Sequence, residues 1–283
     1  NYISAKFSLF EKTGLENAVV NIGDSYGAKL VEKLPTDVNV FAYSAKKSNI
    51  KFYKREKISF IFCEQIEVES FAAKIIKVKS PWGKSTIRVN LLGEFNVENV
   101  LAAFTVLCLS GASIEDVANV LSGFTGLPGR MEAFSSAGKP LIIVDYAHTP
   151  DALEKALMGL KSYCKGKLFC VFGCGGGRDV GKRSQMGSVA ELLSDQIILT
   201  NDNPRDESPD QIFQGILEGI KNKSKVIVKE DRSDAVISTF LEAKKDDMIL
   251  LAGKGHEMTQ QFGSTITPFS DRELAKRLTE EHS

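Results

Sequence analysis

The residues best suited to chemistry lie in a glycine-rich loop, VFGCGGGRDVGKRS, which runs from Val171 to Ser184. Gly176 to Arg183 matches the phosphate-binding pattern G-x-x-x-x-G-K, but Arg183 stands where Ser or Thr would hold Mg²⁺. We therefore reject an ATP-binding P-loop at this position. The turn amides and Arg178 remain suited to a carboxylate, which a guanidinium binds through two parallel hydrogen bonds. A tight turn with solvated basic residues is the plainer alternative.

Two later segments place charged groups after apolar runs. TNDNPRD carries Asp202 and Arg205, and AGKGHE carries Glu257 beside glycines that allow close backbone approach. Guanidinium groups suit the carboxylate of a zwitterion, and carboxylates suit its ammonium. A solvated turn is the alternative for the NPR segment, and for His256 we favour a hydrogen-bonded structural role.

Asp145 in VDYAHTPD follows a further apolar run. A carboxylate at the end of a strand often binds ribose hydroxyls. The alternative is a helix start, for which Thr149 or Asp151 would supply the cap.

The second half of the chain alternates apolar β-branched segments with amphipathic ones. This rhythm predicts an α/β fold with a mostly parallel sheet, in which ligands bind beyond the carboxyl ends of the strands. We place a domain boundary near Ala137, in the Gly/Ser/Pro-rich segment SSAGKP, and so expect domains 1–137 and 138–283. The predicted strands are 140–147, 167–173, 195–200, 225–230 and 247–255, and the predicted helices are 149–163, 181–193, 208–220, 231–245 and 271–278.

The first half is more mixed. Residues 4–12 have helical periodicity, and 18–21 and 38–43 are short strands. The strand-rich stretch 58–90 resembles a hairpin or small meander. Helices are expected at 96–111 and 113–124, the second with Ser113 as its N-cap and Asp116 three residues on.

The composition excludes several classes of partner. The 283 residues include 36 Lys or Arg and 36 Asp or Glu, so no overall charge attracts nucleic acid or a membrane surface. No apolar run approaches the ~18 residues that cross a bilayer. Five cysteines without a CxxC pair indicate free thiols and a cytoplasmic protein. The chain begins at Asn1 rather than Met, which we interpret as a fragment or a processed chain.

Taken together, VDYAHTPDALEKAL, FGCGGGRDVGKR, DNPR and AGKGHE resemble the Mur ligases of bacterial cell-wall synthesis. GEFNVENVLAAF and GLPGRME upstream support the resemblance, which covers essentially the whole chain. It implies the second half of a central ATPase domain followed by a Rossmann-like domain. The family's P-loop and nucleotide-sugar domain have no counterpart here, so we expect a chain that is inactive by itself and a monomeric full-length enzyme.

The resemblance also implies roles for individual residues. ATP would phosphorylate the glutamyl carboxylate of UDP-MurNAc-L-Ala-D-Glu, and an amine of meso-diaminopimelate would attack the acyl phosphate, with Mg²⁺ screening the anions. Lys6 matches a carbamylated lysine that holds a metal, Asn99 an adenine contact, Arg130 an arginine near the ribose and phosphates, and Asp145 a ribose ligand. The diaminopimelate pocket would comprise Arg178, Asp202, Asn203, Pro204, Arg205, Gly253 and Glu257. Gly177 departs from the family, whose members often carry Asp or Asn there.

Diaminopimelate is lysine with a second carboxylate, which Arg205 would pair with, and lysine-adding relatives tend to lack the arginine of DNPR. Two alternatives stay open. One is a ligase like folylpolyglutamate synthetase, which would not be expected to carry DNPR. The other is a nucleotide-binding module without catalysis, although the chain lacks the GxGxxG pattern of NAD sites.

Overall fold

The computed structural model describes residues 2–50 and 53–280. The chain forms two compact units, Asn1–Thr125 and Gly126–Ser283. This division falls ahead of Ala137 because a short strand, β6 (Glu132–Phe134), pairs with β7 (Leu141–Asp145) in the sheet of the second unit.

The first unit holds a five-stranded sheet in the order β1-β2-β3-β4-β5. Its first three strands are parallel, and β3, β4 and β5 form an antiparallel meander, as the sequence predicts. The strands are β1 (Asn17–Asn21), β2 (Asn39–Ser44), β3 (Ile58–Val68), β4 (Lys74–Ser80) and β5 (Gly83–Val89). The helices are α1 (Tyr2–Phe7), α2 (Ser25–Lys33), α3 (Phe95–Leu109) and α4 (Ile114–Gly123), with 3-10 turns at Ser8–Glu11 and Lys47–Asn49.

Local capping explains two of these helices. Ser113 Oγ accepts a hydrogen bond from the amide of Asp116 at 3.1 Å, which confirms the predicted start of α4. Helix α2 was not predicted from the sequence. It begins because Asp24 accepts from the amide of Tyr26 at 2.6 Å, a strong N-cap that outweighs the low helix propensity of the following residues.

The second unit holds a six-stranded sheet in the order β10-β9-β8-β11-β7-β6, parallel except for β6. The remaining strands are β8 (Leu168–Phe172), β9 (Gln196–Leu199), β10 (Val226–Val228) and β11 (Met248–Ala252). The helices are α5 (Pro150–Lys161), α6 (Gly181–Leu193), α7 (Pro209–Leu217), α8 (Arg232–Glu242) and α9 (Asp271–Glu280). A separate hairpin joins β12 (Thr259–Phe262) to β13 (Thr265–Pro268).

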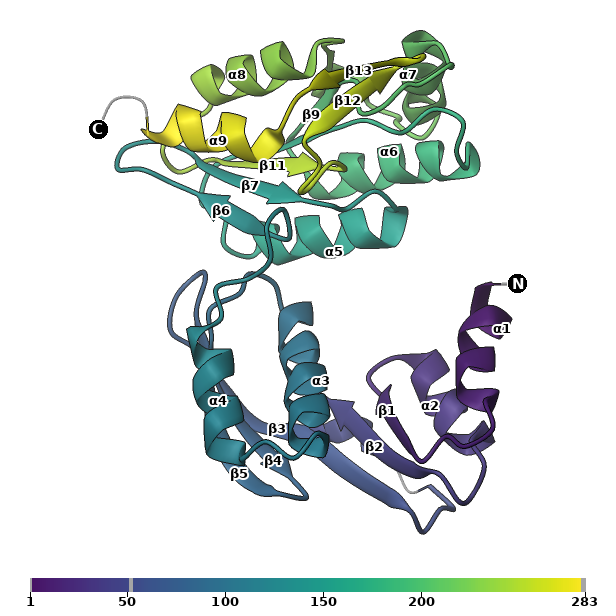
Figure 1. Ribbon diagram of the computed structural model, residues 1–283. Coiled ribbons are helices and arrows are strands. Elements are labelled where there is room, and N and C mark those ends of the chain that lie inside the picture. The colour runs from purple at the N-terminus through teal and green to yellow at the C-terminus, as the bar shows by residue number, and fades with distance from the viewer. Residues whose placement is uncertain (1, 51–52, 281–283) are drawn as a thin grey trace. The chain divides into compact units, whose positions relative to one another are not determined.

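Helices cover both faces of this sheet, with α5 and α6 on one side and α8 and α9 on the other (Figure 1). Alternate strand residues point to opposite faces. The face under α8 and α9 forms one buried core of Ile142, Val144, Phe169, Val171, Ile198, Ala235, Val236, Ile249, Leu251, Leu274 and Ala275. The predicted α/β fold with a mostly parallel sheet is therefore confirmed.

Strand order determines where a ligand site can form. The chain leaves β8 for α6 on one face, whereas after the neighbouring β11 it reaches α9 on the other. Such a reversal opens a crevice beyond the carboxyl ends of the two strands. The glycine-rich loop follows β8, and the AGKGHE segment begins in β11.

The cysteines are free, and Cys63, Cys108, Cys170 and Cys174 are buried, as predicted. Burial raises the pKa of the Cys174 thiol to about 11, so this thiol is protonated at neutral pH. Among residues 2–50 and 53–280, no helix is long and apolar enough to cross a membrane.

Candidate functional site

The glycine-rich loop and the NPR segment hold each other directly at the ends of β8 and β9. The amide of Gly176 donates to the carbonyl of Asn203 at 2.9 Å, and Arg205 Nη1 donates to the carbonyl of Gly176 at 2.9 Å. A Cβ on Gly176 would lie 1.8 Å from the carbonyl oxygen of Pro204, so only glycine permits this approach. The two loops therefore form one structure.

Arg178 and Arg205 flank the same point of this loop. A Cβ placed on Gly175 would be 2.9 Å from Nη1 of Arg205 and 3.6 Å from Cγ of Arg178. Arg178 is exposed, whereas Arg205 is half-buried. The structure thus brings together the two arginines that the sequence predicted for anion binding.

Arg205 has an unusual backbone, with φ at 53° in the left-handed region. Its amide donates to the carbonyl of Gln261 at 3.1 Å, and its carbonyl accepts from the amide of Gly263 at 2.7 Å. A non-glycine residue adopts this conformation only where its surroundings hold it. The β12–β13 hairpin, which was not predicted from the sequence, holds Arg205 in this conformation.

Asp202, Asn203 and Glu257 gather beside the arginines. Asn203 Nδ2 donates to Glu257 Oε2 at 2.9 Å. Partial burial would raise the pKa of Glu257, but hydrogen bonds from Asn203 and Lys254 outweigh it and hold that pKa below the usual range. Asp202 lies deeper, and burial raises its pKa despite the positive charges of Arg232 and Lys254. The sequence thus placed both carboxylates correctly at strand ends, and the structure brings them together.

Lys254 is a member of this cluster that sequence reasoning did not assign. Its side chain is fully buried, and Nζ lies 3.0 Å from Glu257 Oε2 and 3.3 Å from Asn203 Oδ1. The available signal was its position between Gly253 and Gly255, three residues before Glu257.

Gly253 is required by the shape of the site. It has φ at 110°, and a Cβ there would lie 2.7 Å from Oδ2 of Asp202. Its amide donates to the carbonyl of Asp145 at 3.1 Å, which ties the end of β11 to the end of β7.

Asp145 holds the loop that carries Arg130. Oδ2 of Asp145 accepts from the amide of Met131 at 2.8 Å, and Oδ1 accepts from the amide of Ala147 at 2.9 Å. Burial raises the pKa of Asp145, while these amides and Arg130 oppose the rise. The amide of Tyr146 also donates to this carboxylate.

Arg130 lies over an aromatic group at the end of β7. Its guanidinium carbon is 4.6 Å from the centre of the Tyr146 ring, a cation–π distance. The rings of His148 and His256 pack against Tyr146 at 4.6 and 5.5 Å. Thr149 Oγ1 accepts from the amide of Ala152 at 3.3 Å, so Thr149 is the N-cap of α5.

Lys6 and Asn99 belong to the first unit, and the other predicted site residues belong to the second. Lys6 is an exposed residue of α1. Asn99 is an exposed residue of α3, where its Nδ2 donates to Asn96 Oδ1 at 2.9 Å. Within the described ranges, no group of three or more His, Cys, Asp or Glu is placed to hold a metal ion.

Arg183, the residue that breaks the P-loop pattern, has a structural contact. Its guanidinium pairs with both oxygens of Glu207, at 2.7 Å for Nη2, and is buried. Glu207 also accepts from the amide of Gly177 at 3.1 Å. The arginine thus ties α6 to the segment that carries Arg205, which agrees with the rejection of a P-loop here.

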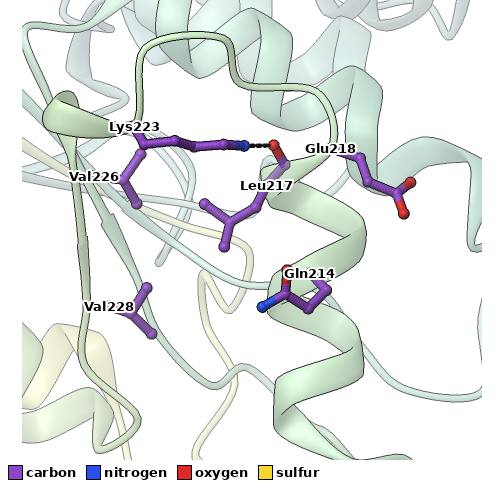
Figure 2. Close-up of a pocket in the computed structure, with 6 residues that line it drawn as sticks. All are labelled: Gln214, Leu217, Glu218, Lys223, Val226 and Val228. Atoms are coloured by element: carbon purple, nitrogen blue, oxygen red, sulfur yellow. Dashed lines mark hydrogen bonds between the residues drawn. The ribbon is translucent and has the colours of Figure 1, made fainter.

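A surface groove of about 450 Å³ lies elsewhere in the second unit, between α7 and β10. Its lining residues are Gln214, Leu217, Glu218, Lys223, Val226 and Val228 (Figure 2). The ammonium of Lys223 donates to the carbonyl of Leu217 within the chain. The groove contains none of the predicted residues, and we place the candidate site at the strand ends.

Family models identify the class of protein to which these two units belong. Residues 1–107 match the Mur ligase middle domain, and residues 129–255 match the Mur ligase glutamate ligase domain. The chain belongs to the Mur ligase family.

Particular relatives are similar over nearly the whole chain. The UDP-N-acetylmuramoyl-L-alanyl-D-glutamate--2,6-diaminopimelate ligase of Coxiella burnetii is 45% identical over 279 residues, covering 98% of this chain and 55% of the relative. The enzyme of the same name from Buchnera aphidicola is 37% identical, and the match covers 99% of this chain and 55% of that enzyme. A solved structure titled with the same ligase name has 32% identity and a TM-score of 0.59, and the match covers 99% of this chain and 56% of that one. The chain therefore spans about half the length of these relatives.

Proposed function

We propose that this chain contributes the amino-acid pocket of an ATP-dependent ligase that joins meso-diaminopimelate to UDP-MurNAc-L-Ala-D-Glu in peptidoglycan precursor synthesis. The observation that carries the proposal is that the guanidinium of Arg205 and the carboxylate of Glu257, which follow β9 and β11, lie close enough for the charge of Arg205 to lower the pKa of Glu257. Arg205 meets the glycine-rich loop at 2.9 Å, while Glu257 is held by Asn203 at 2.9 Å on the adjoining segment. The similarity to ligases of that name supports the choice of substrate.

The pocket suits one end of a diamino dicarboxylic acid. Arg205, with Arg178 beside it, would bind the carboxylate at the end that does not react, and Glu257 would accept from the ammonium there. Because the NPR loop is tied to the glycine-rich loop and to the β12–β13 hairpin, binding requires little reordering of the chain. The ligand is thereby oriented with its second amino group directed away from the pocket.

That second amine is the nucleophile in the proposed reaction. ATP transfers its terminal phosphoryl group to the glutamyl carboxylate, giving an acyl phosphate and ADP. The amine adds to the acyl carbon, a proton leaves the nitrogen, and phosphate departs as the amide forms. Asn99, Arg130 and Asp145 are the proposed contacts to ATP, at adenine, phosphate and ribose.

Mg²⁺ would neutralise the crowded phosphate and carboxylate oxygens, with Lys6 as a carbamate supplying one ligand. Lys6 is exposed on α1, and its neutral amine would add to carbon dioxide with release of a proton to give the carbamate. We further propose a monomeric, cytoplasmic enzyme, in keeping with substrates made inside the cell.

Calorimetry on the 283-residue chain tests the pocket. We expect binding of meso-diaminopimelate and weaker binding of lysine, which lacks the carboxylate that Arg205 binds. A lost charged hydrogen bond of about 1.5–3 kcal/mol corresponds to roughly 10–150-fold in affinity. Arg205→Met should reduce diaminopimelate affinity to that of lysine.

Lys182→Met is the matched control. Lys182 is a nearby cation at the start of α6, but its Nζ donates to the carbonyl of His148 at 2.8 Å rather than entering the carboxylate cluster. It should keep the affinity of the unchanged chain. Equal affinity for diaminopimelate and lysine would remove the assigned substrate, preferential binding of glutamate would favour the folylpolyglutamate type of ligase, and binding of NAD alone would favour a nucleotide module.

A further inference from the structure

Lys254 lies in the middle of the site, but the proposed function gives it no role. Its side chain is 0% exposed, and its Nζ contacts Glu257 Oε2 at 3.0 Å, Asn203 Oδ1 at 3.3 Å and Asp202 Oδ1 at 3.8 Å. Removing an ammonium from water is costly unless charged and polar partners replace the water. The three oxygens of the pocket are therefore what allows the ammonium of Lys254 to be buried.

The charges around it leave a simple balance. Arg232 and Asp271 are both buried and pair with each other at 2.7 Å, so they cancel. Asp202 and Glu257 carry two negative charges, and Lys254 compensates one of them. Arg205 also acts on Glu257, but in the proposed function its charge is matched by the carboxylate of the ligand. One negative charge remains for a ligand, which matches the single ammonium at one end of an amino acid.

Lys254 also determines which oxygen of Glu257 is available. Both Lys254 and Asn203 bind Oε2. In the part of the chain that the structure describes, no hydrogen bond reaches Oε1. The glutamate is thus fixed through one oxygen, and the other is left for a ligand.

We propose that Lys254 is a positioning and specificity-determining residue. It orients Glu257 and leaves the pocket with one uncompensated negative charge. The pocket can therefore bind one ammonium group without taking up or releasing a proton. This inference rests on the proposed function. Lys254 does not touch the ligand and acts through Glu257.

The proposal predicts a proton-linkage effect in Lys254→Met. Without the buried ammonium, Glu257 faces the negative charge of Asp202 and takes up a proton, which the ammonium of the ligand must then displace. The charged and polar groups that act on the two carboxylates are Asn203, Arg205, Arg232, Lys254 and Asp271. All of these groups except Lys254 are unchanged in this variant. Any new coupling between proton release and ligand binding therefore comes from the loss of the Lys254 ammonium.

The experiment is calorimetry of meso-diaminopimelate binding to the 283-residue chain between pH 6 and 8, in buffers of different ionisation enthalpy. Relative to the unchanged chain, Lys254→Met should release about one additional proton, and its affinity should rise by up to about tenfold per pH unit. A purely structural role for Lys254 would weaken binding equally at every pH. If affinity depends on pH in the same way in both chains, and both release the same number of protons on binding, the inference is wrong.

A second variant keeps the test decisive if Lys254→Met does not fold. Lys254→Met with Glu257→Gln removes one positive and one negative charge together and restores the balance. We expect this double variant to fold and to bind weakly, with the pH slope of the unchanged chain. A double variant that stays unfolded or shows a steeper slope would refute the charge argument. Failure of the unchanged chain to bind diaminopimelate is a separate outcome, and it refutes the proposed function itself.

Discussion

The guanidinium of Arg232 binds the carboxylate of Asp271 through two hydrogen bonds, from Nε at 2.9 Å and from Nη2 at 2.7 Å. Both side chains are buried. Nη2 also donates to the carbonyl of Ala252 at 3.0 Å, at the last residue of β11. The pair therefore connects α8 and α9 to the strand end from which the AGKGHE loop leaves.

Breaking this pair should destabilise the second unit. Arg232→Met leaves a buried carboxylate without its partner, which costs about 3–5 kcal/mol. Hydrogen exchange of the β11 amides should report the loss. The only tryptophan, Trp82, is in the first unit, so its fluorescence midpoint in urea should not change. Arg232→Met with Asp271→Leu should recover most of the stability, and an equally unstable double variant would contradict this explanation.

The pair of Glu207 and Arg183 should make stability depend on acid pH. The hydrogen bond from Arg183 lowers the pKa of Glu207, with the amide of Gly177 adding to the effect. A lowered carboxyl pKa gives stability that is complete above the ordinary value, about 4.3, and is lost as pH falls through the folded-state value. In urea unfolding from pH 6 downward, Glu207→Gln should therefore show a shallower decline than the unchanged chain.

Glu218→Gln is the control for that experiment, because Glu218 is an exposed residue that follows α7. It should keep the original decline with pH. A Glu207→Gln curve parallel to that of the unchanged chain would show that the ion pair contributes nothing to acid stability.

Two glycines with left-handed backbones allow the cost of backbone strain to be measured apart from the cost of steric overlap. Gly129 has φ at 66°, and a Cβ there would lie 2.2 Å from the amide nitrogen of His256. Gly138 has φ at 80°, with nothing within 4 Å of such a Cβ. Gly138→Ala should cost about 1–2 kcal/mol from the backbone alone. Gly129→Ala should cost about 1–3 kcal/mol more in the same chemical denaturation series, because the overlap displaces the AGKGHE loop. Equal losses of stability in the two variants would mean that the AGKGHE loop shifts to accommodate the added Cβ without cost.

The sequence could predict the elements whose signals are local. Apolar β-branched runs identified the parallel strands from β7 to β11, and Pro150 and Ser113 marked helix starts. The glycines and arginines at strand ends could be grouped because parallel strands share one carboxyl edge. Residue type and strand periodicity were enough for these predictions.

Other features depend on contacts between distant residues. Strands β12 and β13 are short and polar, and they form because they pair with each other and because β12 meets Arg205. Nothing local indicates that Lys254 is buried, since lysine is normally exposed and its partners are far along the chain or in the next turn. The order of strands was also open, because the connection rules allow more than one arrangement.

The position of β11 has a consequence for how the chain is made. This strand is the last of the six-stranded sheet in sequence, yet it lies between β7 and β8, pairing Met248 with both Leu141 and Leu168. A ribosome releases β7 and β8 long before residues 248–252, so the nascent chain holds two edges that await a central partner. The second unit must therefore close late in synthesis, and a stop codon ahead of Met248 would leave a sheet split down its middle rather than a shortened one.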